Sequence, residues 1–217
     1  MKWLKIDKSS KSKPRGSNWR KWKDRLAEEG RFQCVYCAIP ESSFGGTRNF
    51  HVEHYKPKSR FPSLASSYNN LFYSCAICNT FKGNDWPGNP NTRLSNPAYA
   101  NPSIKDFNSL FSIDPTTLEV SGNSQSPRYM IEKLYLNRPQ LIQERQIDRG
   151  LKLLCEQGEL LRHLMSRMAS ARMSRKLVVL LSKAVNIQTQ LNDLQRDLRS
   201  TRPYTSKQVK KGTRKKK

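Results

Sequence analysis

Apolar residues in the last third of the chain recur at the spacing of an α-helix. The segment PRYMIEKLYL predicts a helix that ends near Asn137, ahead of Pro139. Beyond it, two apolar stripes predict two longer helices; the stripes are Leu141, Ile147, Leu151, Leu154, Leu161, Leu164 and Met168, then Leu177, Leu180, Ala184, Ile187, Leu191, Leu194 and Leu198. The second stripe alternates steps of three and four. We interpret it as packing between two antiparallel helices, with a surface that binds a partner as the alternative.

The first half of the chain has shorter patterns. SNWRKWKDRLAEEG predicts a short helix that ends at Gly30 and buries Trp19, Trp22 and Leu26 on one face. SLFSIDPTTLEVSGN alternates on both sides of an Asp-Pro turn, which predicts two short strands. WPGNPNTRLSNPAYANPS predicts an irregular loop. Residues 1–16 are rich in Lys and Ser, and we expect them to be poorly ordered.

These patterns divide the chain into five parts, and the expected fold class is α+β. The parts are a basic segment with a helix at 1–30, a small core at 31–90, a loop and short hairpin at 91–125, a mainly α-helical region at 126–200 and a disordered basic tail at 201–217.

Basic residues concentrate at the two ends of the chain, whose formal net charge is +23. Residues 1–25 hold ten Lys and Arg against two acidic residues, and residues 202–217 hold eight against none. Clustered positive charge attracts polyanions, with an affinity that falls as salt rises. We therefore expect nucleic acid, either DNA or RNA, as a partner. The alternative is a pair of solvated tails with no binding role.

Other features exclude several classes of protein. The longest aliphatic run, LVVLL, is too short to span a bilayer, and the start of the chain lacks the apolar region of a secretory signal. We expect a cytoplasmic protein with no membrane partner. The chain contains no G-x-x-x-x-G-K-[ST] loop, so any dependence on ATP must come from another chain.

Two cysteine pairs predict a structural zinc site. Cys34 and Cys37 are spaced as C-x-x-C, and Cys75 and Cys78 repeat that spacing after a gap of 37 residues. Four thiolates from two such pairs can surround one tetrahedral zinc ion with no position open for water. The alternative is two unrelated pairs, either free or in disulfides. Cys155 stands alone on an apolar helix face and is interpreted as a core residue.

The segment between the pairs and the residues after them carry candidate catalytic groups. Hydrolysis of a phosphodiester needs a base that works near neutral pH, which His54 can supply. It also needs a divalent cation with oxygen ligands, and Glu53 and Asn79 offer a carboxylate and an amide. Lys82, one helical turn after Asn79, and Lys58 are expected to contact substrate phosphates.

One geometric objection concerns the FHVEHYKPKS segment. In a regular strand Glu53 and His54 point to opposite faces, so they could not share a site. The strand must therefore end or bend there, and Pro57 is consistent with this. His51 would then share a face with Glu53, as a third metal ligand or a phosphate contact.

The motifs together resemble the HNH endonuclease family in its zinc-stapled ββα-metal form, over residues 34–83. The resemblance implies that His54 is the general base and that Glu53, where the family often has Asp, and Asn79 bind one Mg²⁺ or similar ion such as Mn²⁺. It implies that Asn70 is the central asparagine whose hydrogen bonds orient the base. It also implies products with a 3′-hydroxyl and a 5′-phosphate.

A narrower resemblance concerns the biological setting. CVYC, HVEHYKPKS and CNTFKGN, between a basic N-terminal helix and a helical C-terminal region, look like the PtuB-like HNH subunits of Septu and retron-associated anti-phage defence systems. Those subunits work with an ATPase partner, which the heptad-like helices would bind. Against a nuclease stands a non-catalytic zinc module that only binds nucleic acid. A third reading is a nuclease centre that is silent until its partner docks.

Overall fold

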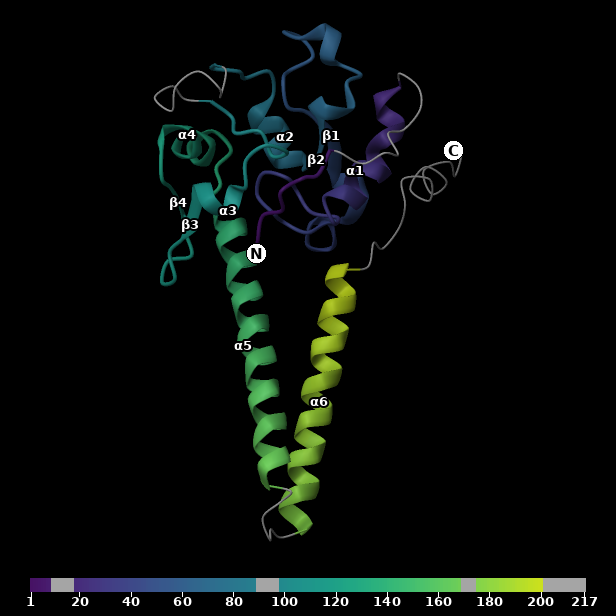
Figure 1. Ribbon diagram of the computed structural model, residues 1–217, viewed down its shortest axis with the longest axis vertical. Coiled ribbons are helices and arrows are strands. Elements are labelled where there is room, and N and C mark those ends of the chain that lie inside the picture. The colour runs from purple at the N-terminus through teal and green to yellow at the C-terminus, as the bar shows by residue number, and fades with distance from the viewer. Residues whose placement is uncertain (9–17, 89–97, 169–174, 201–217) are drawn as a thin grey trace, which may run out of the picture. The chain divides into compact units, whose positions relative to one another are not determined.

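The computed structural model describes residues 1–8, 18–88, 98–168 and 175–200 (Figure 1). Its fold class is α+β, as the sequence predicts. The chain divides into two compact units, one from Met1 to Glu144 and one that begins at Arg145 and contains most of the two long C-terminal helices.

A β-hairpin followed by a helix forms the centre of the first unit. Strands β1 (Phe50–His54) and β2 (Leu71–Cys75) pair antiparallel, and helix α2 (Ala76–Lys82) follows β2 directly. Cys75 ends the strand and caps the helix, because its Sγ accepts a hydrogen bond from the backbone N–H of Cys78 at 3.5 Å. One short segment therefore supplies both the strand end and the helix start.

The two strands differ in how they are buried. Every residue of β2 is buried, whereas β1 exposes His51 and keeps Phe50 in the core. The rings of Phe50 and Tyr73 stack with their centroids 4.8 Å apart. Aromatic residues suit a pleated, buried surface, so side-chain packing stabilises this hairpin together with its antiparallel pairing. One face of β1 is left for polar groups.

The predicted N-terminal helix is present in two parts. A 3₁₀ turn, η1 (Trp19–Trp22), leads into α1 (Lys23–Glu29), and Gly30 caps the end. Trp22 and Leu26 are buried, as expected, while Trp19 is only half-buried.

The expectation that residues 1–16 are poorly ordered is wrong for the part that is described. Trp3 and Ile6 are both buried in the hydrophobic core. The Trp3 indole N–H donates to the backbone oxygen of Tyr36 at 2.8 Å. Two large apolar side chains among lysines are enough to dock this segment, while residues 9–16 lie outside the described residues.

The remaining elements of the first unit are short. The hairpin predicted around the Asp-Pro turn is confirmed, since β3 and β4 pair antiparallel. The predicted helix before Asn137 ends earlier, because the chain turns at Tyr135, whose φ is 48°. These elements are η2 (Glu41–Phe44), η3 (Gly46–Asn49), η4 (Pro62–Leu64), η5 (Tyr68–Asn70), α3 (Phe107–Leu110), β3 (Phe111–Ile113), β4 (Val120–Gly122) and α4 (Gln125–Lys133).

The second unit is a pair of antiparallel helices, as predicted. Helices α5 (Pro139–Met168) and α6 (Arg175–Ser200) touch where the Gln188 amide donates to the backbone oxygen of Leu154 at 2.9 Å (Figure 1). Gly158 provides the close approach, because a Cβ there would meet the Gln188 side chain at 2.7 Å.

The interpretation of the α6 stripe as the packing face between these helices is wrong. Its members within the described side chains are exposed, namely Leu177, Leu180, Ala184, Ile187 and Leu191. Residues that include Leu181, Val185 and Gln188 are the half-buried ones instead. Because α6 has apolar residues on two faces, the period alone does not identify the face that packs. In the parts of the chain that the structure describes, no helix is long and apolar enough to cross a membrane.

Candidate active site

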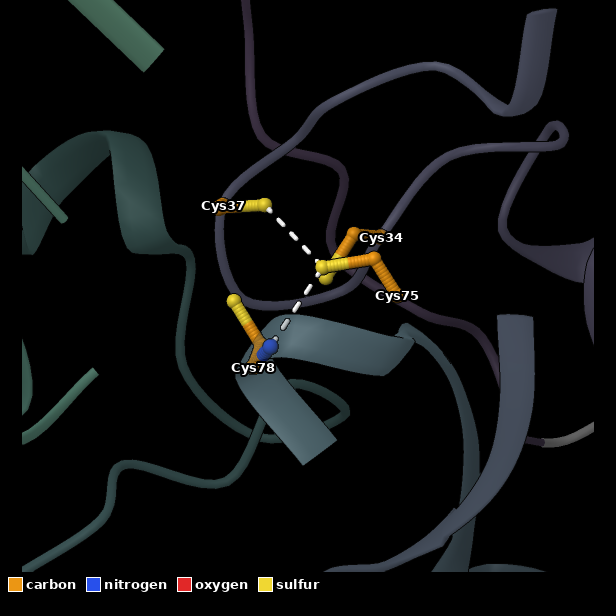
Figure 2. Close-up of side chains that lie close together, drawn as sticks. All are labelled: Cys34, Cys37, Cys75 and Cys78. Carbon is orange, nitrogen blue, oxygen red and sulfur yellow. Dashed lines mark hydrogen bonds between the residues drawn. The ribbon is translucent and has the colours of Figure 1, made fainter. Parts of the chain in front are cut away.

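Four cysteine side chains from two distant segments converge in the first unit (Figure 2). Cys34 and Cys37 lie on the turn between α1 and η2, and Cys75 and Cys78 lie at the junction of β2 and α2. All four are buried, and their sulfur atoms lie within 4.8 Å of one another. The two C-x-x-C pairs therefore form one cluster.

The geometry of this cluster suits a zinc ion. A tetrahedral site with Zn–S bonds of about 2.3 Å places neighbouring sulfur atoms about 3.8 Å apart. The sulfur atoms of Cys37 and Cys75 are separated by 3.8 Å, and all four cysteines are free of disulfides. Within the described residues no other group of three or more Cys, His, Asp or Glu side chains is close enough to hold a metal. The fit is to a structural ion enclosed by four thiolates.

Arg138 adds positive charge beside the cysteine cluster. Its guanidinium donates to Sγ of Cys37 at 3.7 Å and to Sγ of Cys78 at 3.9 Å. Burial lowers the pKa of Arg138, but the negative charges of the nearby cysteine sulfur atoms raise it by more. The net shift of this pKa is therefore upward. A guanidinium here would offset the excess negative charge that four thiolates leave on a zinc ion. The turn before α5 is thereby tied to the two cysteine-bearing segments.

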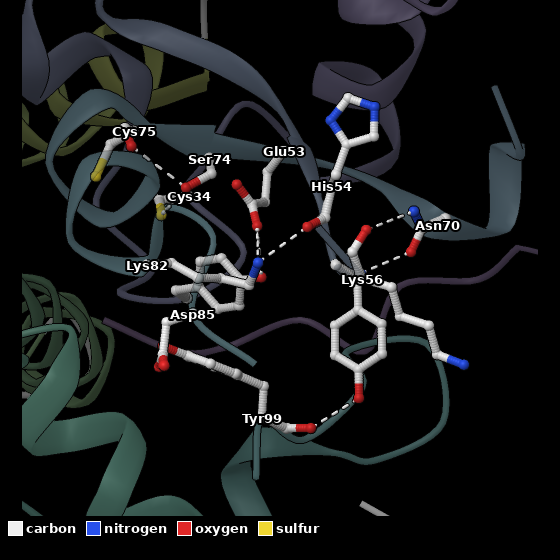
Figure 3. A network of polar contacts seen from close by, with 12 residues as sticks. Cys34, Glu53, His54, Lys56, Asn70, Ser74, Cys75, Lys82, Asp85 and Tyr99 are labelled. Atoms are coloured by element: carbon white, nitrogen blue, oxygen red, sulfur yellow. Dashed lines mark hydrogen bonds and ion pairs between the residues drawn. The ribbon is translucent and has the colours of Figure 1, made fainter. Parts of the chain in front are cut away.

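Beside the β-hairpin lies a cavity of about 440 Å³ that gathers most of the predicted site residues. Glu53 and His54 reach it from the end of β1, and Asn79 reaches it from α2. His51 and Lys58 line the same cavity. The strand ends at His54, but Glu53 and His54 are both still paired with β2, and Figure 3 shows the Glu53 carboxylate turned toward Lys82 and the His54 ring turned away from it. The two residues line one cavity with their side chains on opposite sides of the strand.

His54 is held in one orientation and one tautomer. Its Nε2 lies 3.0 Å from the backbone oxygen of Ala65. A carbonyl oxygen only accepts hydrogen bonds, so Nε2 carries the hydrogen and Nδ1 keeps its lone pair. Burial lowers the pKa of His54, and the positive charges of Lys58, Lys82 and Arg20 lower it further against the opposing effect of the Ala65 bond. The ring is therefore a neutral base near neutral pH.

Asn70 ties together the loop that supports His54. Its side-chain oxygen accepts from the backbone N–H of Lys56 at 2.8 Å, and its amide donates to the backbone oxygen of Lys56 at 3.0 Å (Figure 3). The amide also donates to the backbone oxygen of Leu64 at 3.2 Å. Leu64 directly precedes Ala65, the hydrogen-bond partner of His54. Asn70 itself is buried and does not line the cavity.

Glu53 and Lys82 form a buried ion pair behind the cavity. Lys82 Nζ lies 2.6 Å from Glu53 Oε1, and it also donates to the backbone oxygen of His54 at 2.9 Å (Figure 3). The Tyr36 hydroxyl donates to the same carboxylate oxygen at 3.3 Å. Burial raises the pKa of Glu53, and the ion pair with Lys82 opposes that rise. The expected phosphate contact of Lys82 would require its enclosed ammonium to leave Glu53.

The oxygen donors at the cavity suit a divalent cation. Mg²⁺ is usually held by one or two carboxylates together with water and substrate phosphates. Glu53 supplies the carboxylate, with both of its hydrogen bonds made by Oε1, and Asn79 supplies an amide oxygen at the same cavity. The donor set fits a hard ion that is completed by substrate and water.

Some of the residues that line the cavity were not assigned to it from the sequence. Among these, Trp19, Arg20 and Lys23 come from the N-terminal η1 and α1 elements. The Trp19 ring meets the His54 ring edge-on with centroids 4.8 Å apart. The only sequence signal was the alternation of Trp with basic residues in NWRKWK, which is as compatible with core packing as with a site.

Comparison with known proteins agrees with the ββα geometry. Residues 34–85, about a quarter of the chain, match the family model described as HNH endonuclease. No curated protein and no solved structure matches the chain. The matched residues contain the four cysteines, Glu53, His54, Asn70 and Asn79. Trp19, Arg20 and Lys23 lie outside them.

Replacing Cys75 with Ser should remove the bound zinc and destabilise the first unit, because metal binding and folding are coupled at closed thiolate sites. Cys155→Ser is the matched control, since Cys155 lies on α5 outside the cluster. Zinc content by atomic absorption and the midpoint of thermal unfolding test both variants. Equal zinc content in wild type and Cys75→Ser would contradict the assignment.

Replacing Lys82 with Met should cost about 3–5 kcal/mol in the free energy of unfolding, because it leaves a buried carboxylate unpaired. The double variant Glu53→Gln, Lys82→Met removes both charges and should recover much of that loss. Urea unfolding of the two single variants and the double variant gives the coupling between the residues. Additive losses would mean that the pair does not interact as the 2.6 Å separation implies.

Proposed function

We propose that the chain is a metal-dependent endonuclease that hydrolyses phosphodiester bonds in nucleic acid. One observation carries the proposal: Glu53, His54 and Asn79, which bear a carboxylate, an imidazole and an amide, all line one cavity of about 440 Å³ beside the β-hairpin. The match of residues 34–85 to the HNH endonuclease family supports it independently. The excess of basic residues supports a polyanionic substrate.

His54 acts as the general base in this proposal. Its Nδ1 takes a proton from a water molecule, whose oxygen attacks phosphorus as the bond to the 3′-oxygen breaks. The products are a 5′-phosphate and a 3′-oxygen that takes a proton from solvent. Asn70 is a positioning residue, because its hydrogen bonds hold the loop that carries Ala65, the partner of His54. Lys58 and His51 contact substrate phosphates from the cavity wall.

Glu53 and Asn79 would hold a Mg²⁺ or Mn²⁺ ion, which when bound stabilises negative charge on the phosphate. Lys82 and Tyr36 keep the Glu53 carboxylate in place from the buried side. The four cysteines would hold a structural Zn²⁺ ion that takes no part in the chemistry.

The alternative function is a zinc-stabilised module that binds nucleic acid without cutting it. Such a module has no need of an imidazole that is fixed in one tautomer beside a carboxylate and an amide. The hydrogen bond from His54 to Ala65 is a specific reason to prefer the nuclease.

His54→Ala should reduce cleavage by about 10²- to 10⁴-fold, because it removes the base without touching the cysteine cluster. The assay uses plasmid DNA, single-stranded DNA and total RNA with Mg²⁺ or Mn²⁺. Cleavage by wild type should stop with a chelator and return when Mg²⁺ is added back. Zinc content and circular dichroism of the variant should equal those of wild type.

Two outcomes of this assay would overturn the nuclease proposal. Undiminished cleavage by His54→Ala would assign the activity to a contaminant or to another base. Binding of nucleic acid by a folded, zinc-loaded wild type that never cleaves, even with its partner present, would favour the binding module.

We also propose that the nuclease serves in anti-phage defence with an ATPase subunit, on the resemblance to PtuB-like HNH subunits. The exposed stripe on α6 supports a partner, because contiguous apolar residues on a surface usually mark an interaction site. A partner of this kind would also account for a nuclease that is silent alone.

Leu180→Glu and Ile187→Glu should abolish co-purification with a co-expressed ATPase subunit of such a system. Val179→Glu is the matched control, because Val179 is also exposed but lies off the stripe. Light scattering of the isolated chain reports whether a second copy covers the stripe instead. Co-purification that survives both stripe variants would refute this surface as the docking site.

A further inference from the structure

The N-terminal η1 and α1 elements form a second wall of the catalytic cavity. Trp19, Arg20 and Lys23 line that wall, across from residues of β1 and the loop after it. The edge-on contact of Trp19 with His54 brings this wall against the proposed base. Because the wall lies outside the HNH match, its role has to be inferred from its own chemistry.

Positive charge dominates this cavity. Arg20, Lys23 and Lys58 line it, and Glu53 is the one acidic residue among the lining side chains that the structure describes. The charge of Glu53 is already balanced from behind by Lys82. The cavity therefore presents an excess of cations to whatever enters it.

The Trp19 ring organises two of these cations. The Arg20 guanidinium lies 4.5 Å from the ring centroid, and Lys58 Nζ lies 5.2 Å from it. Cations held near an aromatic ring lose less freedom when they bind an anion than cations on free side chains. Lys23 is also positioned, because its Nζ donates to the backbone oxygen of Thr47 at 2.5 Å.

These cations share the cavity with both of its histidines, because Arg20, Lys23 and Lys58 line it together with His51 and His54. Guanidinium and ammonium groups are the usual protein contacts to backbone phosphates.

We propose that Arg20 and Lys23 bind the backbone phosphates of the nucleic acid strand beside the scissile bond. Trp19 positions Arg20 and Lys58 for this contact. The N-terminal helix is then part of the active site, and substrate enters between it and the β-hairpin. The inference rests on the proposed nuclease function, whose substrate contacts it specifies.

The test compares Arg20→Gln and Lys23→Gln with Lys21→Gln, all in the His54→Ala background to prevent cleavage. Lys21 is the matched control, because it is exposed on the same 3₁₀ turn and does not line the cavity. Fluorescence anisotropy measures binding of a labelled DNA duplex, its single strand and the RNA of the same sequence over a range of salt concentrations.

Each cavity variant should weaken binding several-fold and reduce the slope of log K against log salt by about 0.9 on duplex DNA or about 0.7 on a single strand. Lys21→Gln should change the slope much less. The salt slope reports phosphate contacts, so a loss of folding would not mimic it, and equal thermal midpoints verify the fold. With His54 intact, Arg20→Gln should raise KM more than it lowers kcat.

Equal salt slopes for all three variants would overturn the proposal. In that case Arg20 and Lys23 would attract nucleic acid only through the net positive charge of the protein, as Lys21 does, and not by direct contact with a phosphate. If the wild type cleaves and Arg20→Gln leaves the slope of the His54→Ala protein unchanged, the contact is refuted while the nuclease function stands. A wild type that binds but never cleaves would refute the nuclease and leave the contact measurable. A wild type that binds none of the three probes would overturn both.

Discussion

The convergence of four cysteine side chains is the constraint on which the rest of the first unit depends. It joins the turn between α1 and η2 to the junction of β2 and α2, two segments that lie far apart in the sequence. Because Cys75 both ends β2 and caps α2, fixing its sulfur fixes the angle between strand and helix. Glu53 on β1, which pairs with β2, and Asn79 on α2 then line the same cavity. Arg138 extends the constraint to the turn before α5.

In the buried Lys82–Glu53 pair, Lys82 orients the residues proposed to act in catalysis without being one of them. Taking two charges out of water is costly, and a buried pair is seldom a net gain in stability over apolar residues. Its effect here is geometric. One ammonium holds the Glu53 carboxylate and the backbone oxygen of His54 together, so the proposed metal ligand and the proposed base keep a fixed relation. Asn70 does the same for the loop on the other side of His54.

Much of this site could be predicted from sequence because its chemistry is local in the chain. The doubled C-x-x-C spacing anticipated the cysteine cluster, and the Glu-His pair before a proline anticipated a strand that ends at His54. The role of Lys82 could not be read in this way. A lysine one turn after Asn79 is as compatible with solvent as with a buried carboxylate, and only the packing around Tyr36 and Tyr99 encloses it. The same limit explains α6, which has two apolar faces and uses the less regular one against α5.

The distribution of cations resolves a conflict within the proposed chemistry. A site that attracts phosphate needs positive charge, whereas a general base needs a lone pair. Burial is the main cause that lowers the pKa of His54, and the positive charges of Lys58, Lys82 and Arg20 act in the same direction. Positive neighbours therefore satisfy both needs when the base is a histidine, because they disfavour a charged imidazole. The same positive charges would also lower the pKa of an aspartate or glutamate base. A carboxylate is already deprotonated at neutral pH, so the lower pKa would only make it a weaker base. A cavity rich in arginine and lysine is therefore better served by His54 than by a second carboxylate.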